Sequence, residues 1–87
     1  MELTTKNYNT KNYGRTTYIE IDGFSVASVT QQKLFDDKEV WDAPRMEMYA
    51  VRLIDTEHAD LMKDALCMAA ELFEEWSEDT GKEIVEG

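Results

Sequence analysis

The dipeptide Asp22-Gly23, flanked on both sides by alternating apolar and polar residues, constrains the fold of this chain more than any other feature. A two-residue type I′ turn requires positive φ at both central residues, and Asp-Gly is one of the pairs that supply it. The runs TTYIEI and FSVASV therefore predict two antiparallel strands, at residues 16–21 and 24–29. The register that follows pairs Ile21 with Phe24, Ile19 with Val26 and Thr17 with Ser28 on one face, and Glu20 with Ser25, Tyr18 with Ala27 and Thr16 with Val29 on the other. The first face is the more consistently apolar and is expected to face the core.

A third strand is predicted at residues 45–54, RMEMYAVRLI, after an irregular stretch. The second hairpin strand is expected to continue through Leu34 and Phe35 as a long, curved ribbon. Residues 36–44 are expected to form a loop, because Pro44 keeps the residue before it out of helical geometry. Both faces of the third strand are largely apolar, with Tyr49, Val51 and Leu53 on one and Met46, Met48, Ala50 and Ile54 on the other. Such a pattern is typical of a central strand or of one with a second partner surface, and core packing is favoured over an interface.

One long helix is predicted at residues 55–80 by apolar residues that recur at spacings of three and four. These residues are Ala59, Leu61, Met62, Ala65, Leu66, Ala69, Leu72, Phe73 and Trp76. Asp55 or Thr56 can cap the helix, and Gly81 is expected to end it as the C′ residue. The predicted fold class is α+β, a small three-stranded antiparallel sheet in β-β-β-α order, covered on one face by one long C-terminal helix.

The length of 87 residues predicts a single domain at 1–87. Within it, residues 1–14 are expected to be a flexible N-terminal arm, 15–54 a β-meander, 55–80 an acidic amphipathic helix, and 81–87 a short tail that either pairs with a sheet edge or frays. The arm contains TKNY twice, at 5–8 and 10–13, with a five-residue period that matches neither strand nor helix. A polar, poorly ordered tail is favoured, and a tyrosine-bearing contact arm is the alternative.

The net charge of −10 is concentrated at the C-terminal end of the chain. Residues 55–87 contain eleven acidic and two basic residues, which accounts for −9 of that total. Direct binding to nucleic acid is not expected, because phosphate contacts need clustered Lys and Arg. A partner with a basic surface is expected instead, since the summed charge of a protein steers its association.

The acids of the predicted helix form a second row at helical spacing, on the side away from the apolar residues. We call this row, with the neighbouring Glu75, the acidic stripe: Glu57, Asp60, Asp64, Glu71, Glu74, Glu75 and Glu78. The stripe is about 32 Å long, and its charges recur about once per 5.4 Å turn, on the scale of the charges along a nucleic-acid backbone. It is either a solvated face that keeps the protein soluble or a binding surface for a basic partner. Trp41, in the predicted loop, is either an exposed partner-binding anchor or a lid packed on the sheet edge.

The sequence contains no pattern that predicts catalysis, a metal site or a cofactor. His58 is the only histidine and has no Ser or Cys neighbour that would make a triad, and Cys67 lies among acids, where it makes a poor nucleophile. The acids between residues 36 and 42 lack the spacing of a calcium loop, and a phosphate-binding glycine loop is missing. The N-terminus has no apolar run of the signal-peptide kind, and 18 apolar residues never occur together. A cytoplasmic protein that does not bind membranes is therefore expected.

In general character (small, acidic, a single domain, without catalytic residues) the chain resembles phage-encoded inhibitors of host defence, including anti-CRISPR and anti-restriction proteins that mimic nucleic acid. This resemblance implies a non-enzymatic interaction protein, a small acidic inhibitor that blocks a basic surface such as that of a nucleic-acid-binding protein. The alternative is a structural or adaptor protein that forms a homodimer through the apolar second face of the strand at 45–54. The two functions differ in salt dependence, because only the electrostatic contact weakens steeply with ionic strength.

Overall fold

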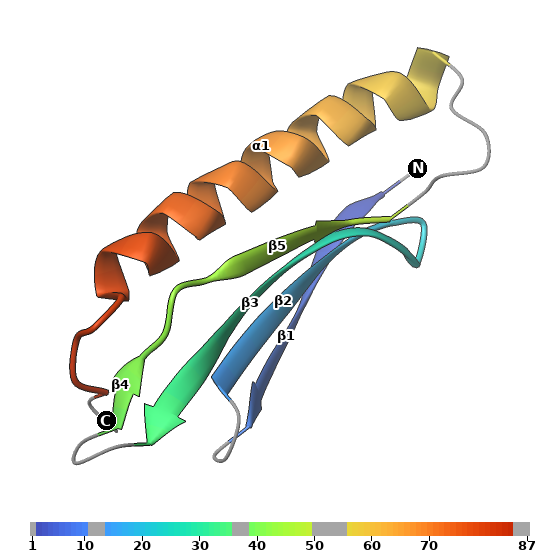
Figure 1. Ribbon diagram of the computed structural model, residues 1–87. Coiled ribbons are helices and arrows are strands. Elements are labelled where there is room, and N and C mark those ends of the chain that lie inside the picture. The colour runs from blue at the N-terminus through green and yellow to red at the C-terminus, as the bar shows by residue number, and fades with distance from the viewer. Residues whose placement is uncertain (1, 11–13, 36–38, 50–55, 85–87) are drawn as a thin grey trace.

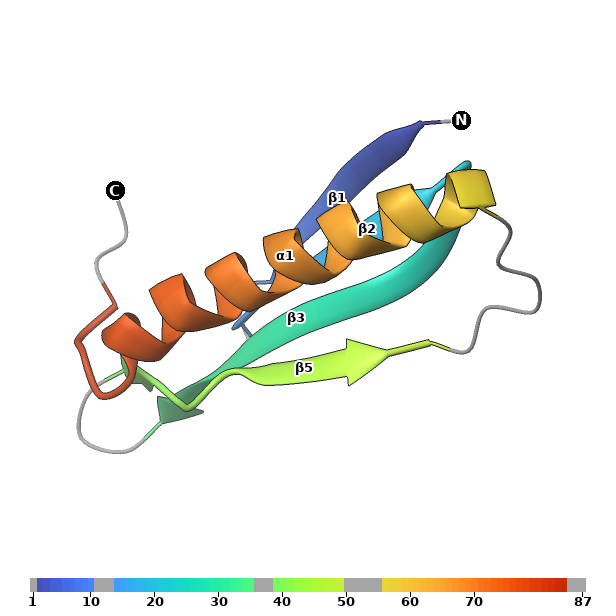
Figure 2. The ribbon, with the colours of Figure 1, turned by 90° about the horizontal axis from the view of Figure 1, so that it is seen from above.

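A single long helix lies along one face of a curved antiparallel sheet (Figures 1 and 2). The computed structural model describes residues 2–10, 14–35, 39–49 and 56–84. The elements are β1 (Leu3–Thr10), β2 (Gly14–Ile21), β3 (Phe24–Phe35), β4 (Glu39–Trp41), β5 (Arg45–Met48) and α1 (Thr56–Asp79). The molecule measures 50 × 22 × 20 Å, so it is a two-layer α+β rod rather than a sphere. The α+β class and the C-terminal helix are as predicted, but the sheet has five strands rather than three.

The β2–β3 hairpin has the predicted turn and a register that differs from the prediction after two pairs. Asp22 and Gly23 have φ values of 51° and 83°, which confirms the type I′ turn. The pairs Ile21–Phe24 and Glu20–Ser25 form as predicted. A β-bulge then shifts the register, so that the pairs are Ile19–Ala27, Tyr18–Ser28, Thr17–Val29 and Thr16–Thr30, and the four predicted pairs beyond Ser25 are wrong by one residue.

The bulge has a physical reason in the sequence of β3. Val26 and Ala27 are adjacent apolar residues, and strict alternation would turn one of them toward solvent. A bulge sets two residues of one strand opposite one residue of the other, which leaves both side chains free to be buried. Val26 and Ala27 are both buried in the core. The bulge therefore puts Ala27, Val29 and Gln31 on the face of β3 that α1 covers.

The N-terminal segment is a strand, so the predicted flexible arm at 1–14 is wrong. β1 pairs antiparallel with β2 from Leu3–Ile21 to Thr10–Gly14. Its residues from Thr4 to Asn9 are exposed, so backbone pairing and cross-strand contacts hold it rather than burial. The Tyr8 and Tyr18 rings meet edge to face at 5.6 Å, and the Thr17 hydroxyl donates to the Asn7 side chain over 2.7 Å. Residues 1 and 11–13 lie outside the described residues.

The other edge of the sheet is made by two short strands in succession. β4 pairs with the end of β3, and β5 pairs with its middle, between Ala27 and Thr30. Pro44 separates them, since it has no N–H to donate to a ladder. The strand Glu39–Trp41 falls within the predicted loop 36–44, which was wrong at those three residues. β3 extends to Phe35 as predicted, and residues 36–38 lie outside the described part.

β5 confirms the first four residues of the strand predicted at 45–54, whereas Tyr49 is described and is not part of the strand. Residues 50–54 lie outside the described part. Within the part of the chain that is described, β5 pairs only with β3. It is therefore an edge strand rather than a central one. All four of its residues are exposed, so the favoured assignment of its methionines to the core is wrong for Met46 and Met48.

The helix α1 packs on the sheet through small residues at its centre. Ala65 and Ala69 are fully buried against the core residues Ile19, Ala27 and Val29, and larger side chains extend the contact at the edges. These partly buried neighbours are Leu3, Leu61, Met62, Met68, Leu72 and Phe73. The predicted helix is confirmed, and so is most of its apolar side, but Ala59 and Leu66 of the predicted row are exposed. Asp55 lies outside the described residues.

The C-terminal end of α1 leads into a tail that covers the edge of β4. Gly81 has a φ of 79°, as predicted for the residue that ends the helix. Its backbone N–H donates to the Trp41 carbonyl over 2.8 Å, and the Ile84 N–H donates to the Glu39 carbonyl over 2.9 Å. Edge pairing was thus the right alternative for the tail as far as Ile84, and residues 85–87 are not described. Among the described residues, no helix is long and apolar enough to cross a membrane.

Candidate functional site: the acidic face of the helix

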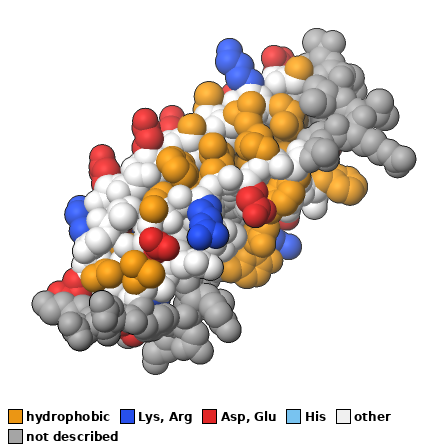
Figure 3. Space-filling model, viewed as in Figure 1, with side chains coloured by type: hydrophobic (Ala, Val, Ile, Leu, Met, Phe, Trp, Pro, Cys, Tyr) orange, Lys and Arg blue, Asp and Glu red, His pale blue; other side chains and the backbone are white. Residues whose placement is uncertain are grey.

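The acidic stripe lies on the side of α1 that points away from the sheet. Each residue of a helix is rotated by about 100° from the one before it, so the burial of Ala65, Ala69 and Trp76 turns the stripe outward. The described side chains of the stripe are all exposed: Asp60, Asp64, Glu71, Glu74, Glu75 and Glu78. Figure 3 shows acidic side chains protruding along the outer edge of the helix. The side chain of Glu57 lies outside the described part.

These six carboxylates have no ion-pair partner among the described residues; the one ion pair there joins Arg15 to Asp79. Three pairs of the stripe are four residues apart, namely Asp60–Asp64, Glu71–Glu75 and Glu74–Glu78, and such like charges destabilise a helix by a few tenths of a kcal/mol each. The last turn of α1 also contains no basic residue, although the helix dipole favours one there. The charges of the helix therefore destabilise it, and apolar packing on the sheet compensates for this effect.

A cleft of about 290 Å³ runs beside the stripe, between α1 and the β1 side of the sheet. Glu71 and Glu75 line it from the helix, with the apolar side chains of Met68 and Leu72. The sheet contributes Thr5, Asn7, Thr17 and Ile19. A lysine or arginine side chain has a matching construction, because its apolar stem can be buried while its charged end stays near carboxylates at the rim. The sequence could not predict this cleft, since one of its walls is the unpredicted strand β1.

Trp41 lies away from this cleft, at the C-terminal end of α1. Its half-buried ring stacks on the Arg15 guanidinium at 4.3 Å, and the ring of Trp76 lies at the same distance from that group. Both distances are within the range of a cation–π contact. This placement matches the interpretation of Trp41 as a lid packed on the sheet edge, and its role in partner binding stays a prediction.

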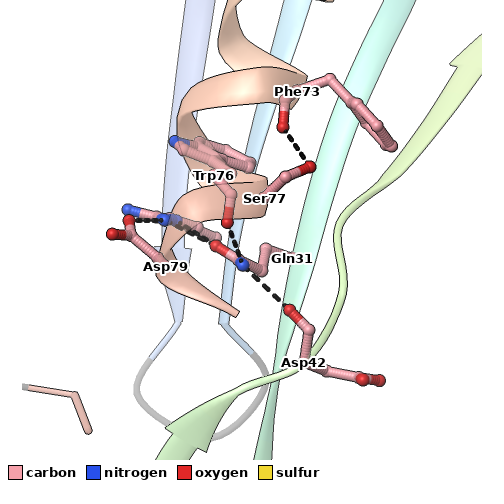
Figure 4. A network of polar contacts seen from close by, with 7 residues as sticks. Gln31, Asp42, Phe73, Trp76, Ser77 and Asp79 are labelled. Carbon is pink, nitrogen blue, oxygen red and sulfur yellow. Dashed lines mark hydrogen bonds and ion pairs between the residues drawn. The ribbon is translucent and has the colours of Figure 1, made fainter. Parts of the chain in front are cut away.

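A polar network that the sequence did not predict joins this end of α1 to the sheet (Figure 4). Gln31 is fully buried and donates to the carbonyl oxygens of Trp76, over 2.8 Å, and Asp42, over 2.9 Å. Its own side-chain oxygen accepts from Arg15, which also pairs with Asp79 at 2.7 Å. Every buried side-chain polar atom in the described part has a hydrogen-bond partner. The network is therefore a satisfied structural link rather than a reactive site.

The arrangement as a whole suits the binding of cationic groups. In the described ranges, no three His, Cys, Asp or Glu side chains gather closely enough to hold a metal ion. Cys67 is exposed within the row of acids, and the side chain of His58 lies outside the described residues. The geometry thus offers a row of carboxylates and a cleft beside it. No protein-family model, curated protein or solved structure matches this chain.

Proposed function

We propose that this chain is a non-enzymatic interaction protein, a small inhibitor that uses the acidic stripe to block a basic surface of a partner protein. The single observation that carries the proposal is the row of six exposed carboxylates without ion-pair partners in the described structure. A helix gains nothing from such a row, since alternating charges would stabilise it better. Solubility requires charge on the surface but not its arrangement in a row. Clustered Lys and Arg side chains of a partner would bind such a row.

The spacing of the charges favours a partner that ordinarily binds nucleic acid. From Asp60 to Glu78 the stripe extends over about 27 Å of helix, with charge on most turns and a gap between Asp64 and Glu71. A groove that binds a phosphate backbone presents Lys and Arg side chains at similar intervals. Such a groove is complementary to the stripe in sign and in length, and occupation of the groove would exclude nucleic acid.

The cleft beside Glu71 and Glu75 adds a feature that a plain charged surface lacks. Met68 and Leu72 provide apolar contact for the stem of a partner's Lys or Arg, and the two glutamates lie where its charge would rest. Removal of these carboxylates is therefore expected to weaken binding more than removal of acids elsewhere on the surface.

The test compares two variants that lose the same charge from different places. One carries Asp64→Asn, Glu71→Gln and Glu75→Gln, and the matched control carries Glu2→Gln, Glu20→Gln and Glu83→Gln. A partner captured from extract of the source organism at low salt is purified, and its affinity for each variant is measured at about 50 and 500 mM salt, where surface charges go from weakly to strongly screened.

The stripe variant should bind about 30- to 100-fold more weakly at low salt, mostly through a slower association rate, and the control should stay within a few-fold of wild type. Nucleic acid that binds the partner should compete with the wild-type protein. Equal loss of affinity in both variants would show that only net charge matters. Equal affinity of the stripe variant and wild type at all salt concentrations would leave the stripe as a solvated face.

A further inference from the structure

Among the described residues, β5 has an open edge whose outward backbone groups are unpaired. Tyr49 donates its backbone N–H to the Val26 carbonyl of β3 over 3.0 Å. Backbone groups along a strand alternate in direction, so the N–H and C=O groups of Met46 and Met48 point away from β3. Within the described residues nothing pairs with them, whereas the tail covers the corresponding edge of β4. An uncovered edge of this kind is a template for another strand.

An apolar surface adjoins this edge on the helix side of the sheet. Met46 and Met48 are paired with Val29 and Ala27, which lie under α1, yet they are 44% and 47% exposed. The helix lies mainly over β2 and β3 and leaves β5 largely uncovered (Figure 2). Leu66 on α1 is 44% exposed, and hydrophobic side chains form a band between helix and β5 (Figure 3). The other open edge, β1, presents mostly polar side chains.

The acidic side chains of α1 lie away from this surface. At 100° per residue, the flank of α1 toward β5 carries Ala59, Met62, Lys63, Leu66, Ala70, Phe73 and Ser77, and none of these is acidic. The opposite flank, toward β1, carries Glu71 and Glu75. In a protein with a net charge of −10, the flank of α1 on the β5 side therefore adds no acidic side chain that would repel a second copy.

We propose that two copies of this chain associate through their β5 strands, antiparallel and about a two-fold axis, to form one continuous sheet. The charges of Arg45 and Glu47 favour one register of the two paired β5 strands. When Met46 lies opposite Met46 of the second copy, Arg45 of each copy lies opposite Glu47 of the other. A register centred on Glu47 would instead set two carboxylates opposite each other, which is destabilising. The Arg45 side chain has no ion-pair or hydrogen-bond partner in the described structure, and the Glu47 side chain accepts only from the Tyr49 hydroxyl, at 3.3 Å.

The two-fold arrangement also limits the size of the contact. Pro44 has no N–H toward the open edge and limits the ladder to the short β5 strand, and the two-fold symmetry of the contact closes it as a dimer.

A charge-reversal series measured by sedimentation tests both the dimer and its register. Arg45→Glu and Glu47→Arg alone should each weaken the wild-type dimer about tenfold, because each turns two attractive pairs into repulsive ones. The double variant should regain affinity within a few-fold of wild type. Met46→Lys should give monomers with an unchanged helical circular dichroism signal. Phe24→Lys, which changes a 76% exposed side chain at the hairpin, should leave the dimer intact.

Hydrogen exchange locates the contact directly. The amides of Met46 and Met48 should become protected as protein concentration rises, while exposed amides of β1 should not. A wild-type chain that sediments as a monomer at about 1 mM would overturn the proposal. A dimer that survives Met46→Lys, or single reversals that the double variant does not rescue, would overturn the interface or its register. The variant with the neutralised acidic stripe should still dimerise, so this proposal and the proposed function fail separately.

Discussion

Different interactions stabilise the two ends of the rod-shaped molecule. At one end Arg15 lies between the rings of Trp41 and Trp76, and the buried Gln31 binds the backbone of two other elements. At the other end the β2–β3 turn projects into solvent, and Phe24 beside it is 76% exposed. Side-chain contacts between distant segments fix the first end. The second depends on the conformation of the turn and on two hydrogen bonds between Asp22 and Glu2, in which each backbone N–H donates to an oxygen of the other residue. Resistance to mutation should therefore differ between them.

The largest effect is expected from Gln31→Leu, at the end held by side chains. The change would remove the Gln31 donor from the buried Trp76 carbonyl and from the half-buried Asp42 carbonyl, and it would remove an acceptor from Arg15. The free energy of unfolding should fall by about 3 kcal/mol, measured by urea denaturation. Gln32→Leu, at the exposed neighbouring position, is the matched control and should change it by less than about 0.5 kcal/mol. Similar values for the two variants would mean that the network contributes little.

At the hairpin end, Gly23→Val should lower the free energy of unfolding by about 1–2 kcal/mol. A side-chain atom added there meets no other atom within 4 Å, so the loss comes from the positive φ alone. Gly23→Asn is the matched control, because Asn tolerates positive φ and should retain most of the stability. An unchanged melting temperature for the Val variant would contradict the local origin of stability at this end.

The smallest effect is expected from Asp79→Asn, at the rim of the network. Asp79 pairs with Arg15 at 2.7 Å, but its side chain is 36% exposed, so solvent screens the interaction. Arg15 would still be held by Gln31 and the two tryptophan rings. The free energy of unfolding should fall by no more than about 0.5–1 kcal/mol in urea denaturation. If Asp79→Asn lowered the free energy of unfolding as much as Gln31→Leu, the ion pair rather than the buried hydrogen bonds would be the main source of stability at this end.

Local patterns predicted those parts of the fold that depend on local causes. The Asp22-Gly23 turn, the helical spacing and Gly81 each act within a few residues, and each is found where the sequence places it. β1 escaped prediction because its side chains are mostly exposed and show no apolar alternation, although its Thr and Tyr residues favour strands. The bulge had one signal, the adjacent Val26 and Ala27, which a strict two-residue alternation cannot bury together.

The candidate site likewise has features that local patterns predicted and features that they did not. Helical spacing alone predicted that the acids of α1 would share an outward face, because the apolar residues fix which side is buried. The cleft beside Glu71, the link through Gln31 and the open edge of β5 each require knowledge of which strands are neighbours. That knowledge depends on contacts between residues far apart in the chain, and the pattern of one segment does not contain it.

The close contact through Ala65 and Ala69 has a consequence for the speed and strength of recognition. Because these small side chains let the helix backbone rest directly on the sheet, α1 cannot roll about its axis without separating the two layers. If the stripe binds a partner as proposed, that partner meets carboxylates whose backbone positions are already set. Only their side-chain rotamers then remain to be ordered, at about 0.5–1.5 kcal/mol for each one immobilised. The same acids on an isolated peptide would also have to form the helix against their mutual repulsion. A synthetic peptide of residues 56–79 should accordingly be a much poorer ligand than the intact protein, despite having every carboxylate of the stripe.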